Sequence, residues 1–141
     1  MSDNETLPKP KSIYDTFETD EGLENEGVWF DFMFGSFKLA YSGNQNFQSA
    51  FTDAMKPYAE AAARGLLDAK VARNILAKAY SRHVVKGWKN VVGRDGVELV
   101  YTPEACASLF NELPRLFDVI RDSATNFANY RKIYVEQVVK N

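Results

Sequence analysis

The stretch GVWFDFMFGSFKLAYS, residues 27–42, decides how the rest of the chain is expected to fold. Apolar side chains alternate on both sides of Gly35-Ser36: Val28, Phe30 and Phe32 come before it, and Phe37, Leu39 and Tyr41 after it. Alternation rich in aromatic residues is typical of strands, and Gly-Ser suits a tight turn. The stretch therefore predicts a β-hairpin. A lone hairpin is marginal in water, so we expect it to pack on helices, extend another sheet or pair with a second chain.

Helical periodicity takes over after the hairpin. Residues 44–63 predict a helix that is broken at Pro57, because proline removes a backbone donor and clashes with the preceding turn. Residues 67–88 predict a second helix, in which Gly87 weakens the last turn. The apolar stripe of this second helix is Val71, Ala72, Ile75, Leu76, Ala79, Tyr80, Val84 and Trp88. Spacings of three and four place such residues on one helix face.

The period changes again over residues 91–101, where Asp95-Gly96 is a hairpin signal. Thr102-Pro103 then predicts a helix start, with a capping hydroxyl followed by proline at the first helical position. Pro114 ends this helix and begins the last one. The buried stripe predicted for the last helix is Leu116, Phe117, Ile120, Ala124, Phe127, Tyr134 and Val138.

These segments predict an α+β fold that is mainly α-helical, with about four helices and one or two small β-hairpins. Residues 1–26 are polar and hold eight acids against two bases, which leaves eleven acids and fifteen bases in the rest of the 141-residue chain. We therefore expect a flexible acidic N-terminal arm over residues 1–26 and a single mainly helical domain over residues 27–141. Ile13, Tyr14 and Phe17 are the exceptions in the arm: they predict either a short docking helix or a solvated tail.

Catalytic chemistry has little support in this composition. The chain has one histidine, His83, and one cysteine, Cys106, too few for the usual zinc sites. Cys106 lies on the apolar side of a predicted helix, where a buried structural thiol is expected. Phosphate-binding glycine motifs are missing. We expect no enzyme activity, no cofactor and no metal, and no membrane span, since no run of about 18 apolar residues occurs.

Two surfaces predicted from the sequence could serve in binding, and each has two interpretations. The predicted second helix carries four basic residues on one face: Lys78, Arg82, Lys86 and Lys89. This face either contacts the phosphates of a nucleic acid or is the ordinary charged outer face of an amphipathic helix. Aromatic residues make up 13% of the chain and crowd the hairpin, and they form either a core or an interface. The candidate partner-binding residues are Trp29, Phe30, Phe32, Phe34, Phe37, Tyr41, Phe127, Tyr130 and Tyr134.

The order of several short motifs resembles a known family. These are SIYDTFETD (residues 12–20), EGVWFDF (26–32), FKLA (37–40), NF (46–47), GW (87–88), RDG (94–96), YTPE (101–104) and NFANYR (126–131). In this order they resemble the tail assembly chaperones of long-tailed (siphovirus-type) bacteriophages, over most of the chain.

The resemblance implies a non-enzymatic role in viral tail morphogenesis in the host cytoplasm. Such chaperones coat the tape measure protein, keep it soluble and leave as tail tube subunits assemble, without being retained in the virion. A longer frameshifted form is thought to recruit the tail tube protein, and this chain would be the short form. A homo-oligomer is expected. The alternatives are a structural head–tail or tail component of the virion, and a small nucleic-acid-binding phage protein that uses the basic face 78–89.

Overall fold

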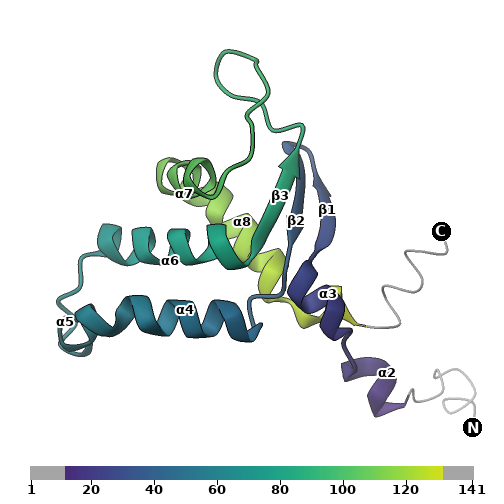
Figure 1. Cartoon of the computed structure of the whole chain (residues 1–141), viewed down its shortest axis with the longest axis horizontal. Coiled ribbons are helices and arrows are strands. Elements are labelled where there is room, and N and C mark those ends of the chain that lie inside the picture. Colours follow the sequence, from purple (N-terminus) through teal and green to yellow (C-terminus); the bar gives the residue numbers. More distant parts are fainter. Residues whose placement is uncertain (1–11, 132–141) are drawn as a thin grey trace, which may run out of the picture.

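The computed structural model describes residues 12–131, in which a three-stranded sheet carries helices against one of its faces (Figure 1). In chain order the elements are α2 (Ile13–Phe17), α3 (Glu21–Glu26), β1 (Val28–Phe32), β2 (Gly35–Leu39), α4 (Gln45–Met55), the 3₁₀ helix η1 (Lys56–Tyr58), α5 (Ala59–Ala63), α6 (Ala69–His83), β3 (Val85–Lys89), α7 (Pro103–Glu112), α8 (Pro114–Thr125) and the 3₁₀ helix η2 (Phe127–Tyr130). The predicted α+β, mainly helical class is confirmed.

The predicted hairpin forms, but its turn lies two residues earlier than expected. β1 and β2 pair antiparallel with Phe32 opposite Gly35, so Met33-Phe34 is the turn. Gly35 instead begins β2 with a φ of +137°, and a Cβ on it would lie 2.8 Å from the Val91 side chain. This glycine is therefore required by the close approach of the segment after β3, not by the turn.

The helix predicted over residues 67–88 is too long. α6 ends at His83, and the following residues form β3, which pairs antiparallel with β2 so that Trp88 lies opposite Phe37. Val84 and Val85 are both buried, and the Ala40 amide donates to the Val84 carbonyl at 2.7 Å. β-Branched residues suit a sheet, and the unpaired edge of β2 supplies the hydrogen bonds that a helix would otherwise provide. Tertiary pairing thus overrides the helical periodicity.

Two other predicted elements differ from the structure. The second hairpin is a loop, in which Val92 and Glu98 form an isolated bridge around Gly96 at a φ of +78°. The last helix ends at Thr125, because Asn126 is extended and caps η2 by accepting from the Ala128 amide. Phe127 therefore belongs to η2, while the predicted stripe residues Tyr134 and Val138 lie outside the described residues.

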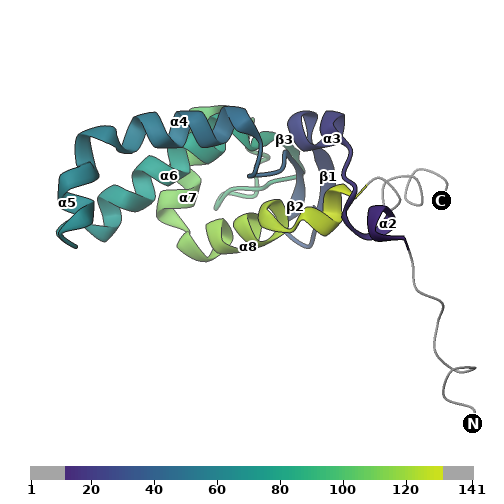
Figure 2. The same cartoon turned by 90° about the horizontal axis from the view of Figure 1, so that it is seen from below.

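Local signals placed α4, α5 and the start of α7 correctly. The break at Pro57 separates α4 from α5, and the Thr102 hydroxyl accepts from the Ala105 amide at the start of α7. α4 and α6 lie side by side, while α8 runs past the sheet toward η2 (Figures 1 and 2).

An aromatic core joins the layers. Phe110 of α7 stacks on Phe117 of α8 with ring centroids 4.6 Å apart, and Tyr80 of α6 meets Phe117 edge-on at 5.3 Å. Phe37 and Leu39 of β2 are fully buried against this layer. Such pairs add geometric specificity to the apolar area they bury.

The described part of the predicted arm, residues 12–26, forms α2 and α3. The Asp20 amide donates to the Tyr130 carbonyl at 3.0 Å, and the Tyr41 amide donates to the Glu24 carbonyl at 2.8 Å. These contacts hold the two helices beside one end of the sheet. Residues 1–11 of the arm lie outside the described residues, and its flexibility stays a prediction.

Tyr130 provides a direct test of this packing. It is fully buried, and its hydroxyl donates to the Leu39 carbonyl at 3.0 Å. Tyr130→Phe should lower the free energy of unfolding by about 1 kcal/mol, since one buried hydrogen bond is lost. Tyr58→Phe, at an exposed tyrosine, is the matched control and should change it by less than about 0.5 kcal/mol. Urea unfolding measures both, and equal effects would contradict the assigned contact.

An apolar groove as the candidate functional site

An apolar groove of about 590 Å³ opens on the surface of the described residues. It lies where the hairpin turn, the loop after β3, the end of α7 and the start of α8 meet. Its lining residues are Phe34, Phe37, Val91, Val92, Gly93, Arg94, Leu99, Leu109, Glu112, Leu113, Arg115, Leu116 and Val119. Three separate stretches of sequence, 34–37, 91–99 and 109–119, thus contribute to one surface.

Pro114 creates one wall of the groove. A residue before proline is disfavoured in the helical conformation, and Leu113 accordingly has φ −123° and ψ 77°. α7 therefore stops and α8 starts in a new direction, leaving Leu113 exposed between them. Leu109 and Leu116, on either side of the break, lie on the same groove.

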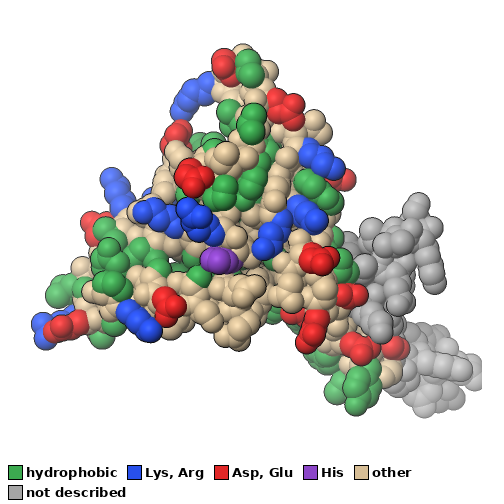
Figure 3. Space-filling model, viewed as in Figure 1, with side chains coloured by type: hydrophobic (Ala, Val, Ile, Leu, Met, Phe, Trp, Pro, Cys, Tyr) green, Lys and Arg blue, Asp and Glu red, His purple; other side chains and the backbone are tan. Residues whose placement is uncertain are grey.

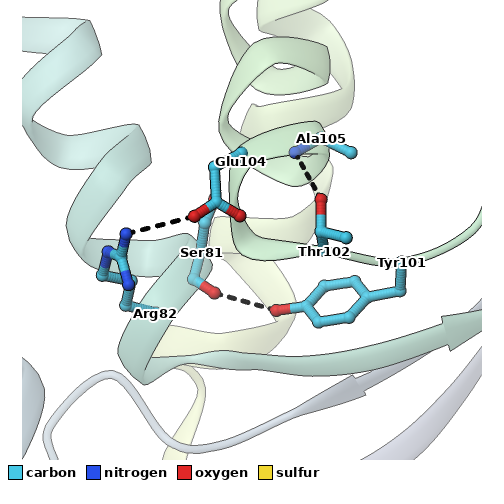
Figure 4. Close-up of polar contacts among 6 residues, drawn as sticks. All are labelled: Ser81, Arg82, Tyr101, Thr102, Glu104 and Ala105. Carbon is cyan, nitrogen blue, oxygen red and sulfur yellow. Dashed lines mark hydrogen bonds and ion pairs between the residues drawn. The ribbon is translucent and has the colours of Figure 1, made fainter.

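The opposite wall is the loop over residues 90–102, which side-chain hydrogen bonds fasten to the core. Trp88 Nε1–H donates to the Leu99 carbonyl at 2.8 Å. The Tyr101 hydroxyl lies 2.9 Å from the Ser81 carbonyl oxygen, as Figure 4 shows, and 2.7 Å from that of Val85. Burial raises the pKa of Tyr101, so its hydroxyl keeps the proton it donates. The groove wall that contains Leu99 is thereby held in place.

The groove combines apolar lining with charges at its edge. Phe34, Val92, Leu113 and Val119 are all exposed although they are large and apolar. Arg94, Arg115 and Glu112 are the charged residues that line it, and neither arginine forms an ion pair with another described residue. An exposed apolar hollow with unpaired arginines suits an amphipathic segment that carries acids beside its apolar face.

The structure separates the predicted partner-binding aromatics into groups. Phe37 and Tyr130 are fully buried in the chain's own core, and Phe30, Phe32, Tyr41 and Phe127 are half-buried. Trp29 and Phe34 are exposed, and Tyr134 lies outside the described residues. Among the eight candidates that the structure describes, Phe34 and Phe37 line the groove and the other six do not.

Trp29 lies apart from the groove on the sheet. Its ring lies beneath the Lys89 ammonium, with the nitrogen 4.1 Å from the ring centroid. A cation over an indole face is a stabilising contact within the chain. Its exposed ring therefore already has one partner.

The basic row does not lie on one helix. Lys78 and Arg82 are on α6, whereas Lys86 and Lys89 are on β3. Lys and Arg side chains still gather over this side of the molecule (Figure 3). Arg82 pairs with Glu104 of α7 at 3.3 Å, as Figure 4 shows. Because the four basic residues are divided between α6 and β3, the helical spacing that suggested phosphate contacts is absent.

His83 lies close to these basic residues. Burial lowers the pKa of His83, and the nearby charges of Lys86 and Arg82 lower it further.

The predicted partner-binding residues did not include five residues of the groove, namely Val91, Val92, Leu113, Leu116 and Val119. The sequence predicts Leu116 in the buried stripe of the last helix, and the other four residues share no periodicity. The signal that could have found the site is the pair of breaks that bound it: the Asp95-Gly96 turn and Leu113-Pro114. Breaks of this kind expose apolar residues that regular elements would bury.

No helix among residues 12–131 has the length and apolar character needed to span a membrane. Within the same residues, His, Cys, Asp and Glu nowhere gather in threes as metal ligands would. The site is therefore described by shape and apolar surface rather than by reactive groups.

Comparison with known proteins assigns the chain to the phage-derived proteins. The family model described as YdaY prophage protein matches residues 42–141, which run from just before α4 to the end of the chain. The chain belongs to this family. The matched part contains α7, α8 and all of the groove except Phe34 and Phe37. No curated protein and no solved structure matches the chain.

The buried thiol of Cys106 is the second test of the fold around this site. Cys106 is fully buried, and burial raises its pKa to about 12. Because the thiolate is the reactive form, Cys106 should resist a disulfide reagent at neutral pH in the native protein and react on unfolding. Absorbance of the released thiol chromophore measures both rates. Equal rates in native and unfolded protein would contradict the burial.

Proposed function

We propose that this prophage protein is a tail assembly chaperone: it binds the tape measure protein in the host cytoplasm and keeps it soluble. In this role it helps to recruit tail tube subunits, directly or through a longer frameshifted form, and is not retained in the virion. The role is non-enzymatic and needs neither cofactor nor metal. Membership of a prophage family and the ordered motifs between residues 12 and 131 support it.

The observation that carries the proposal is the apolar groove. A long tail component that waits for its partners exposes apolar helix faces, which aggregate unless they are covered. An amphipathic helix places its apolar stripe in a groove of this kind and its polar face in water. The exposed lining residues Phe34, Leu113 and Val119 supply the apolar contact, and Arg94 and Arg115 favour a stripe bordered by acids.

The test is co-expression with the tape measure protein encoded in the same prophage, scored by solubility and co-purification. The wild-type chain should keep the tape measure protein soluble and elute with it. Val119→Asp should lower the co-purified amount by about tenfold or more, because an uncompensated charge then enters the apolar contact.

Val71→Asp is the matched control. Val71 is on a helix like Val119, and the two are 37% and 40% exposed, but Val71 lies outside the groove. It should bind as the wild type does. If both variants co-purify equally, the groove is not the client site. If the wild-type chain leaves the tape measure protein insoluble, the chaperone role is wrong, and detection of the chain in purified virions would favour a structural tail component.

A further inference from the structure

α2 exposes an unusual amount of apolar surface for so short a helix. Ile13 is 69% exposed and Tyr14 71%, and Phe17 is exposed as well. The Ser12 hydroxyl caps the helix by accepting from the Tyr14 amide at 3.2 Å. Hydrophobic side chains lie on the surface where α2 projects, at the lower right of Figure 3. We call Ile13, Tyr14 and Phe17 the apolar knob of α2. An exposed apolar surface of this kind is typical of an interaction site.

α2 cannot reach the groove of its own chain. Phe17 stacks on Phe127 at 5.7 Å, and Thr19 forms a bridge with Arg131, so α2 is held at the η2 end of α8. The groove lies at the other end, where α8 begins at Pro114. α8 has 12 residues and is therefore about 18 Å long, and Figure 2 shows α2 and α7 at its opposite ends.

The charges of the two surfaces are complementary. Residues 12–26 hold six acids and no base, and Asp15 and Glu18 lie on or directly after α2. The groove has two arginines, Arg94 and Arg115, against one acid, Glu112. Opposite charge steers the two surfaces together and penalises the reverse orientation.

We propose that the groove of one copy binds α2 of a second copy, with Ile13, Tyr14 and Phe17 against the apolar lining and the acids toward Arg94 and Arg115. The contact joins two different surfaces, so it is heterologous: each copy that donates α2 still has a free groove. Repetition of such a contact gives a ring if it closes and an open chain if it does not.

This contact regulates the same groove that the proposed function assigns to the client, and in that respect it rests on the proposed function. Before the client is made, neighbouring copies cover one another's apolar surfaces. A client helix with an acid-bordered apolar stripe then competes with α2, and a long client with many such stripes displaces α2 from many copies. Self-association and client binding are therefore mutually exclusive at each groove.

The test uses the full chain alone, in sedimentation velocity over a range of concentrations. The wild type should associate as concentration rises. Ile13→Ser with Tyr14→Ser, and separately Val119→Asp, should each weaken association by about tenfold or more, as expected when apolar side chains lose a buried contact. Leu66→Ser, at a leucine that is 71% exposed and outside both surfaces, and Val71→Asp are the controls and should associate as the wild type does.

Mixing the two variants gives the sharpest result. The α2 double variant keeps an intact groove, and Val119→Asp keeps an intact α2, so an equimolar mixture should form one-to-one dimers and nothing larger. Arg115→Glu should also weaken association, and Asp15→Arg in the partner should restore part of it. A wild type that stays monomeric, variants that associate normally, or a mixture that stays monomeric would each overturn the proposal.

The client assay separates this inference from the proposed function. The α2 double variant should still co-purify the tape measure protein, in larger amount than the wild type because its grooves are free. If Val119→Asp abolishes self-association but not client binding, the copy-to-copy contact stands and the client site lies elsewhere. If it abolishes client binding while the wild-type chain is monomeric, the client site stands and the copy-to-copy contact is wrong.

Discussion

β2 is the central strand of the sheet, and the rest of the structure depends on the backbone hydrogen bonds that both of its edges form. β1 fills one edge through a two-residue turn, and β3 fills the other only because the chain leaves α6 at His83. With both edges paired, Phe37 and Leu39 are completely buried and the helices have a sheet face to cover. A buried backbone group without a hydrogen-bond partner is costly, so the pairing is decided by β2 and not by the helix propensity of the segment that joins it.

The groove is a consequence of this pairing together with one proline. β3 ends opposite the start of β2, which places Val91 against Gly35 and sends the following loop over the edge of the core. Trp88 and Tyr101 fasten that loop. Leu113-Pro114 turns α8 away from α7 on the other side. Apolar residues at these two breaks have no neighbour to cover them, because neither a strand nor a helix continues through them.

Patterns among adjacent residues predicted the parts of the fold that depend on adjacent residues. The hairpin, the break at Pro57 and the start of α7 at Thr102-Pro103 each depend on a few adjacent residues, and the structure has all three. β3 could not be found in this way, because Val84 and Trp88 have helical spacing and the strand exists only through its contact with β2, more than 45 residues earlier. The groove was missed for the same reason: its residues come from three stretches that share no period.

An apolar groove and an apolar knob on one small protein pose a single physical problem. Either surface alone invites non-specific association, and stability gives no reason to keep both exposed, since a polar residue at Ile13 or Val119 would remove no core contact. Their separation by the length of α8 prevents each chain from covering its own groove. The surfaces can therefore be covered only between molecules, as in the contacts proposed above with another copy or with a client helix that has an apolar stripe and an acidic border. The proposed role as a tail assembly chaperone would require this property, because such a protein must hold its partner firmly enough to prevent aggregation and still release it when tail subunits arrive.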